Sequence, residues 1–125
     1  MNSIIKKFRD KLNSGDFVYG VFMKTQDPMF VEIQGIADFD FTILDTEHGP
    51  GDVTEQQNNI RASLVRNMLP IVRVNEISES AIGKALDIGA LGVQVPQIEN
   101  AEQAKEAVRL SRFYPYGERG FCRFV

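Results

Sequence analysis

The chain has 125 residues, 43% of them apolar and 25% charged, which indicates one ordinary folded domain and argues against disorder. Its net charge of −3 is mixed in sign and its longest basic run is Lys6-Lys7, so we expect no nucleic-acid partner. No apolar stretch approaches the roughly 18 residues of a membrane span, and the first 16 residues lack the apolar core of a secretory signal. Cys122 is the single cysteine, so no internal disulfide can form. We therefore expect a cytoplasmic protein that does not enter a membrane.

Segments with helical spacing alternate with short apolar segments along the whole chain. A leading helix is predicted over 3–12, ending near Gly15. Strands are predicted over 17–22, 39–44, 70–74 and 92–96. The helices between and after them are predicted to start at Asp27-Pro28, at a capping box formed by Thr54 and Gln57 and reaching about Met68, over 78–88, and at a cap formed by Asn100 with Gln103.

Four strands, each followed by a helix or by the turn-rich tail, predict a parallel α/β sheet with helical crossovers. Two architectures satisfy this order, a doubly wound open sheet and a (β/α)8 barrel. The phosphate-binding pattern G-x-G-x-x-G is absent after the first strand. Four units would make half of a barrel of roughly 250 residues. No linker divides the series, so residues 1–125 are interpreted as one part of a single domain.

Polar residues gather where the predicted strands end. Asp45, Glu47 and His48 follow the second strand, Arg73 ends the third, and Gln97 follows the fourth. Because active sites of parallel α/β folds form at the carboxyl ends of the strands, we expect these side chains to share one rim of the sheet.

These residue types favour proton-transfer chemistry on an anionic substrate. His48, the one histidine, has the side chain best suited to act as a base near neutral pH. Asp45 and Glu47 could orient it, bind a metal, or only cap the following helix. Arg73 stands in an apolar strand and requires an anion, either a substrate carboxylate or oxyanion, or a structural partner such as Asp45 or Glu47.

Four segments of the chain resemble the HpcH/HpaI aldolase family in order and spacing. They are FDFTILDTEHGP at 39–50, PIVRV at 70–74, KALDIGALGVQVP at 84–96 and YPYGERG at 114–120. The resemblance implies a (β/α)8 TIM barrel, of which this chain would cover roughly the first four β/α units. It also implies a class II lyase that, with a divalent metal such as Mg, Mn or Co, reversibly cleaves a 2-keto-4-hydroxy acid to pyruvate and an aldehyde.

The same resemblance assigns roles to three residues. His48 matches the family's general base, Arg73 the residue that stabilises the pyruvate enolate, and Asp87 the residue that raises the basicity of the histidine. By spacing alone, Asp45 is the better local partner for His48. The resemblance places the metal ligands, a Glu and an Asp, on later strands beyond Val125, with none in this chain. It also implies a homo-oligomer, as a hexamer.

Two other functions remain open from the sequence. The same fold could carry a citrate-synthase-like or acyl-CoA lyase activity, distinguished by whether thioesters or aldehydes are accepted. A half barrel could instead be a non-catalytic assembly module. The isolated chain is expected to be inactive and to associate, because open strand edges and an inner face including Val21, Ile43, Val72 or Val95 would lack the opposing half.

Overall fold

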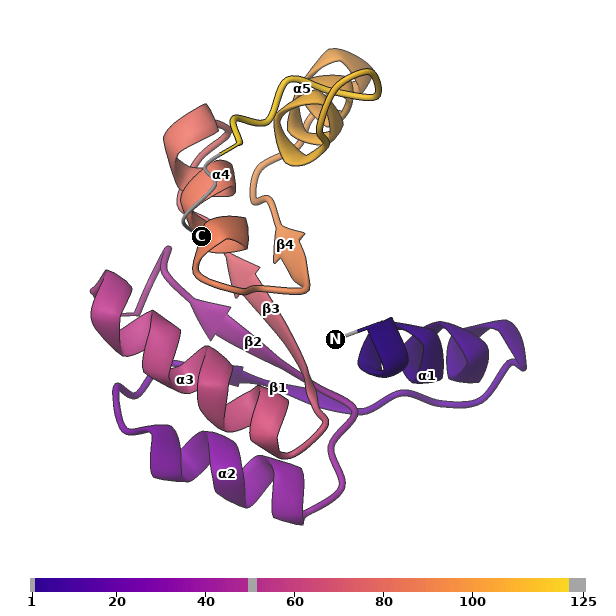
Figure 1. The fold of residues 1–125 in the computed structure, drawn as a ribbon, viewed down its shortest axis with the longest axis vertical. Helices are drawn as coiled ribbons and strands as arrows, with labels where there is room; N and C mark the ends of the chain where they lie inside the picture. Colours follow the sequence, from indigo (N-terminus) through magenta and orange to yellow (C-terminus); the bar gives the residue numbers. More distant parts are fainter. Residues whose placement is uncertain (1, 50–51, 122–125) are drawn as a thin grey trace.

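A computed structural model describes residues 2–49 and 52–121, so Pro50 and Cys122 lie outside the described residues. Four parallel strands pair in chain order to form one sheet: β1 (Gly20–Met23), β2 (Phe41–Asp45), β3 (Leu69–Arg73) and β4 (Gly92–Gln94). The helices are α1 (Asn2–Asn13), α2 (Pro28–Ile36), α3 (Val53–Val65), α4 (Glu79–Asp87) and α5 (Ala101–Ser111). The strand–helix alternation and the parallel sheet confirm the predicted order of elements (Figure 1).

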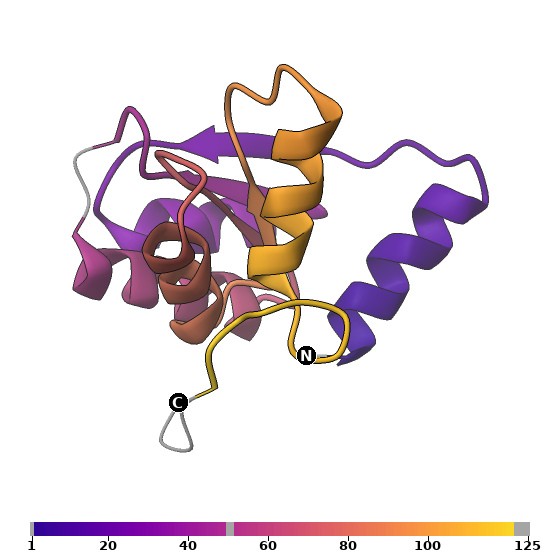
Figure 2. The same cartoon turned by 90° about the horizontal axis from the view of Figure 1, so that it is seen from above.

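Helices α2, α3 and α4 are the crossovers between successive strands, and α1 stands apart from them near the end of the sheet where the strands begin (Figures 1 and 2). Helix α1 is fixed there by two contacts. The ring of Phe8 meets that of Phe41 edge-on at 5.8 Å, and the Lys11 ammonium donates to both oxygens of Asp40 at 2.7 and 2.8 Å. The carboxyl ends of the strands remain uncovered by α1.

The two faces of the sheet have different tasks. Thr42, Leu44 and Val72 are at most 2% exposed and lie on the helix side, where Leu44 and Val72 form part of the hydrophobic core. The register places Ile43 beside Ile71 on the opposite face, where both are half-buried. The prediction that Val72 lines the inner face of the barrel is therefore wrong, because strand residues alternate between faces and Val72 pairs with Leu44 on the core side. Val21, which pairs with Thr42, and Val95, which packs against the core, lie on that side as well, whereas Ile43 lies on the opposite face as predicted.

Two predicted element starts are also wrong. The first strand begins at Gly20, where pairing with Phe41 of β2 starts, and the Tyr19 backbone N–H instead donates to the Asp40 carboxylate. Phe17 and Tyr19, before the strand, are 79% and 60% exposed. Helix α3 begins two residues earlier than the Thr54 pattern indicated. Asp52 is its N-cap and Glu55 completes the capping box, which satisfies the same reciprocal bonding.

Candidate active site

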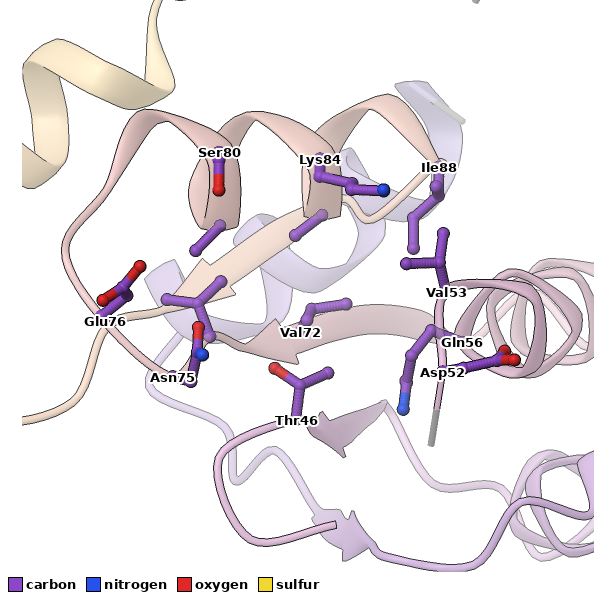
Figure 3. Close-up of a pocket in the computed structure, with 13 residues that line it drawn as sticks. Thr46, Asp52, Val53, Gln56, Val72, Asn75, Glu76, Ser80, Lys84 and Ile88 are labelled. Atoms are coloured by element: carbon purple, nitrogen blue, oxygen red, sulfur yellow. The ribbon is translucent and has the colours of Figure 1, made fainter. Parts of the chain in front are cut away.

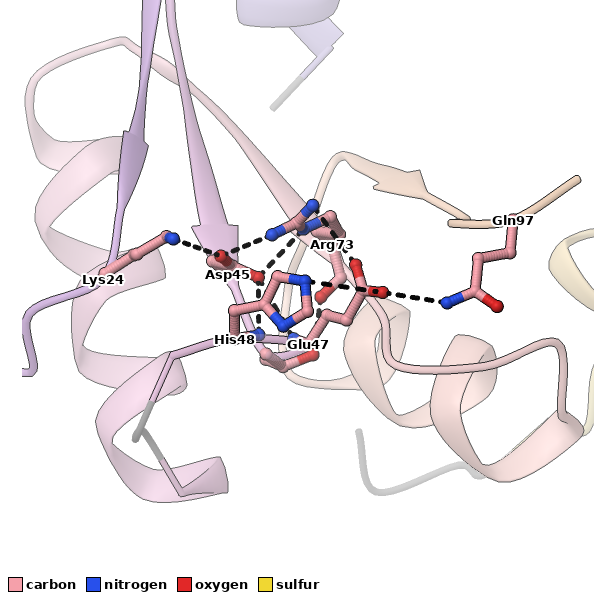
Figure 4. A network of polar contacts seen from close by, with 7 residues as sticks. Lys24, Asp45, Glu47, His48, Arg73 and Gln97 are labelled. Carbon is pink, nitrogen blue, oxygen red and sulfur yellow. Dashed lines mark hydrogen bonds and ion pairs between the residues drawn. The ribbon is translucent and has the colours of Figure 1, made fainter.

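The second and third strands bring the predicted site residues together. Asp45 is the last residue of β2 and is in register with Arg73, the last residue of β3. Glu47 and His48 follow Asp45 in the loop, and Lys24 follows the end of β1 (Figure 4). The rim predicted from strand ends is therefore present in the structure, with these five side chains facing one another.

The Arg73 guanidinium is held by two carboxylates. Its Nε and Nη2 donate to Asp45 Oδ1 and Oδ2 at 2.9 and 2.7 Å, and Nη1 lies 3.2 Å from Glu47 Oε2. It also lies 5.0 Å from the centre of the Phe22 ring, a cation–π geometry. A guanidinium has five N–H donors. Two bond Asp45 and one faces Glu47, which leaves two to meet another anion.

The Asp45 carboxylate is fully buried and is kept ionised by its neighbours. The hydrogen bonds from Arg73, which have the largest effect, and those from the backbone N–H groups of His48 and Glu47, each 3.1 Å from Oδ1, together lower its pKa to about 2, although burial alone would raise it. Asp45 likewise raises the pKa of Arg73. A permanent negative charge thus links the strand end to the loop that carries the histidine.

Gly49 allows this loop to turn tightly over the strand end. A Cβ at Gly49 would lie 2.0 Å from the carbonyl oxygen of Asp45, a distance that no side chain can occupy. Thr46 adds a second tie, because its hydroxyl and its backbone N–H both donate to the Arg73 carbonyl oxygen, at 2.6 and 3.0 Å. The loop geometry therefore depends on backbone contacts as well as on the ion pairs.

The His48 side chain is 61% exposed, and its Nε2 lies 3.8 Å from Glu47 Oε1, an ion-pair distance that is too long for a hydrogen bond. The same Glu47 oxygen accepts a long hydrogen bond of 3.4 Å from Gln97 Nε2, and Gln97 has a positive φ of 57°. His48 is therefore positioned through its backbone, while its imidazole stays open to a molecule at the rim.

Asp87 lies apart from this rim. It ends α4, five residues before β4 begins, and a crossover helix returns the chain to the end where strands start. Its carboxylate pairs with Arg119 at 2.7 Å, and Arg119 also lies 4.5 Å from the centre of the Phe113 ring. This links α4 to the segment that follows α5. Within one chain the structure does not bring Asp87 to His48.

The described carboxylates do not form a metal centre. Within residues 2–49 and 52–121, no three carboxylate, imidazole or thiol groups are grouped to hold one ion. Both Asp45 oxygens are engaged by Arg73, and Glu47 is shared between Arg73 and Gln97. Each carboxylate is thus already paired with a cation, and among the described residues no further ligand group lies close enough to complete a metal site.

A separate cleft of about 350 Å³ lies on the helix side of the sheet, between α3 and α4 (Figure 3). Val72 and Ile88 contribute apolar walls, while Lys84 and Glu76 stand at its polar margins. Thr46, in the loop after β2, also lines the cleft, so the cleft adjoins the loop that carries Glu47 and His48. None of the side chains that pair with Arg73 lines it.

Two residues of the site were absent from the sequence prediction. Lys24 Nζ lies 3.9 Å from Asp45 Oδ2, and the Phe22 ring supports Arg73 from β1. The rule that identified the other rim residues would have found Lys24, since it follows the first strand almost at once. No motif marks Phe22, because its contact arises only from the neighbouring strands.

Residues 18–123 match the family model for HpcH/HpaI aldolase/citrate lyase, and the chain belongs to this family. It is 31% identical over 121 residues to a 2-keto-3-deoxy-L-rhamnonate aldolase of Escherichia coli, and 36% identical over 120 residues to the hydroxypyruvate/pyruvate aldolase of Roseobacter denitrificans. Each alignment covers 96% of this chain but only 45% and 47% of the relative. The chain thus spans about half the length of the curated relatives it matches.

Solved structures show the same relationship. The crystal structure of the citrate synthase SbnG matches with a TM-score of 0.84 at 38% identity, over 90% of this chain and 46% of that one. An HpcH/HpaI aldolase from Desulfitobacterium hafniense matches with a TM-score of 0.84 at 30% identity, over 91% and 44%. The prediction of a parallel α/β unit forming part of a (β/α)8 barrel is therefore confirmed.

Helices long and apolar enough to cross a bilayer are absent from the part of the chain that the structure describes.

Proposed function

We propose that these residues bind and deprotonate the keto acid in a carbon–carbon lyase. The complete enzyme would reversibly cleave a 2-keto-4-hydroxy acid to pyruvate and an aldehyde. One observation supports this most directly. At the strand ends of a chain of this family, the open imidazole of His48 and the guanidinium of Arg73 both approach Glu47, and Asp45 fixes Arg73 from the other side. Such a pair provides a base and a fixed cation, which are the two groups that enolate chemistry needs.

In the synthetic direction, the His48 imidazole takes a proton from the methyl carbon of pyruvate. The electron pair of that C–H bond forms the enolate double bond, and negative charge moves to the keto oxygen. The two N–H groups of Arg73 that Asp45 and Glu47 leave unused donate to that oxygen or to the adjacent carboxylate. The enolate carbon then attacks the aldehyde carbon, and the new alkoxide takes up the proton that His48 gained, which returns the imidazole to its neutral form. Cleavage reverses these steps.

Within this proposal Asp45 and Glu47 are positioning residues. Asp45 orients Arg73 and, through the backbone N–H of His48, the loop that carries the base. Asp87 is assigned a structural task, since its carboxylate pairs with Arg119 on the helix side of the molecule. Asp45 therefore replaces Asp87 as the carboxylate that acts on His48, and it does so through the loop backbone.

A divalent cation is part of the proposal, with the chemistry of polarising the keto oxygen. The described residues do not fit it, because no three groups that could bind one ion are gathered among them. Ligands from later strands, as the resemblance implies, would be needed. A homo-oligomer is proposed on the same resemblance.

The likeness to the citrate synthase SbnG favours a second candidate, in which the enolate forms on a different molecule. In a citrate-synthase-like reaction the base takes a proton from the methyl group of an acyl thioester, and the resulting enolate attacks the keto carbon of the keto acid. The keto acid is therefore the nucleophile toward an aldehyde in the first candidate and the electrophile in the second.

The test uses the longest natural chain that contains residues 1–125, or these residues joined to the complementary half of the Roseobacter relative. Exchange of the pyruvate methyl protons in D₂O is followed by NMR with added Mg²⁺ or Mn²⁺. We expect His48→Ala to slow the exchange by about 10²-fold or more, the contribution of a general base. Glu76→Gln, an exposed change in the loop after β3, is the matched control.

Product analysis with aldehydes and with an acyl-CoA then separates the two candidates. A folded wild-type protein that exchanges no pyruvate methyl protons would exclude the first candidate, and one that exchanges no acetyl-CoA methyl protons would exclude the second. Equal exchange by wild type and His48→Ala would remove His48 from the role of base.

A further inference from the structure

Lys24 places a second cation at the rim. It follows β1, next to the strand that ends in Asp45, and its side chain is 56% exposed. Its Nζ lies 3.9 Å from Asp45 Oδ2, the oxygen that also accepts from Arg73 Nη2. In Figure 4 the ammonium points toward the same carboxylate as the guanidinium, from the opposite side. Asp45 thus stands between the two cations.

Asp45 does not need Lys24. Its Oδ1 accepts from Arg73 Nε and from two backbone N–H groups, and its Oδ2 accepts from Arg73 Nη2 at 2.7 Å. A separation of 3.9 Å is beyond hydrogen-bond range, and ion pairs with an exposed partner contribute at most about 1 kcal/mol. Lys24 is therefore directed toward the site by the field of Asp45 but keeps its donors available.

The charges at the rim balance only when Lys24 is counted. Asp45 and Glu47 supply two negative charges, and Arg73 and Lys24 supply two positive charges. Arg73 donates two hydrogen bonds to Asp45, and its remaining N–H groups can bind one further anionic group. A ligand with a second anionic group would need another cation, and a lysine on a flexible stem can follow groups of different length.

We propose that Lys24 is a specificity-determining residue that binds a carboxylate or phosphate on the far side of the electrophile. This inference rests on the proposed function and narrows its substrate class to electrophiles carrying an anionic group. In the aldol product, the substituent that comes from the aldehyde lies a few bonds from the keto oxygen that Arg73 binds. Lys24 is a cation at the same rim, on the other side of Asp45 from Arg73. Its ammonium donates to the anionic end while Arg73 holds the keto-acid end.

The experiment compares pairs of electrophiles that differ in charge and little in shape. One pair is 4-oxobutanoate and butanal, and the other is glyceraldehyde 3-phosphate and glyceraldehyde, which separates carboxylate from phosphate. Aldol addition to pyruvate is measured for the wild type, Lys24→Gln and Lys24→Arg in the longest natural chain that contains these residues. Lys105→Gln, a change at an exposed lysine on α5, is the control.

We expect Lys24→Gln to lower the ratio of kcat/KM for the preferred anionic aldehyde to that for its neutral counterpart by about tenfold, the worth of one charge-assisted contact. Lys24→Arg should retain most of the ratio, and Lys105→Gln should leave it unchanged. A ratio that is unchanged in Lys24→Gln overturns the inference. This includes an equal loss of kcat/KM with both aldehydes, which would show a general electrostatic or structural effect.

A binding measurement decides the matter independently of turnover. Calorimetric titration with 2-oxoglutarate and with 2-oxopentanoate compares two analogues of the aldol product, in which the carbons derived from the electrophile do or do not carry a carboxylate. The wild type should prefer 2-oxoglutarate, and Lys24→Gln should lose about tenfold of that preference. If the wild type makes no aldol product, the proposed function fails, while the titration still supports or overturns the role of Lys24.

Discussion

Replacing Asp45 by asparagine is the sharpest single perturbation of this site. The substitution retains the shape of the side chain but removes the charge that the buried end of Arg73 faces. It also replaces one acceptor oxygen of the carboxylate by an N–H₂ group, which cannot accept from the Arg73 fork. The Asp45 side chain is 0% exposed and that of Arg73 is 18% exposed, so water cannot fully replace the lost partner.

The magnitude follows from the pKa. In the folded protein the Asp45 pKa is lowered from 3.8 to about 2, and each unit corresponds to about 1.4 kcal/mol, so ionised Asp45 stabilises the fold by about 2 kcal/mol at pH 7. Breaking a fully buried pair costs about 3–5 kcal/mol, but Arg73 keeps Glu47 as a partner. We therefore expect Asp45→Asn to lower the free energy of unfolding by about 2–3 kcal/mol.

The pH dependence has a definite sign. Because the folded-state pKa is depressed, the stabilisation is complete above the ordinary pKa of 3.8 and is lost as the pH falls through about 2. The difference in stability between wild type and Asp45→Asn should therefore shrink as the pH falls from about 4 to about 2.

Urea unfolding followed by circular dichroism, at pH 7 and at steps down to pH 2.5, measures both effects. Asp10→Asn is the control, because Asp10 is 59% exposed in an ion pair with Lys6 on α1. A loss below about 0.5 kcal/mol at pH 7, or one that stays constant down to pH 2.5, would refute the reasoning that the Asp45–Arg73 pair is a buried and stabilising contact.

Two further outcomes are expected at the same rim. Arg73→Lys should reduce kcat/KM by about 10²-fold or more while lowering the free energy of unfolding by only about 1–2 kcal/mol, because an ammonium keeps the charge but not the fork; a variant that unfolds readily yet keeps its specific activity would make Arg73 purely structural. Gly49→Ala should lower turnover by about tenfold or more, because its Cβ would displace the loop from the Asp45 carbonyl oxygen; crystallography or NMR showing an unmoved His48 would contradict that explanation.

The sequence was sufficient to predict the parallel sheet and the grouping of Asp45, Glu47, His48 and Arg73, because strand ends in a parallel sheet share one edge whatever the details of packing. It could not decide whether Arg73 served a substrate or a neighbour. That depended on the register, which sets Asp45 directly opposite Arg73 and turns a general need for an anion into a specific fork.

Other features depended on competing local patterns. The capping pattern at Thr54 was plausible, but the equivalent Asp52 and Glu55 pattern begins two residues earlier and satisfies the first turn with a charged cap. The exposure of Phe17 could not be predicted from its apolar neighbours, because it depends on where pairing with β2 begins, and that pairing starts only at Gly20.

The alternation of faces along β2 and β3 separates the residues that face the proposed active site from those that pack in the core. Phe41, Ile43 and Asp45 face the side where chemistry is proposed, and Thr42 and Leu44 between them face the core. Among the odd positions of β2, Ile43 can change with the least effect on folding, because Phe41 contacts Phe8 and Asp45 forms the buried pair with Arg73, whereas the even position Leu44 must keep its volume. Directed evolution of this half barrel can therefore begin at Ile43 and at Ile71, its neighbour on β3, so that few library members are lost to misfolding.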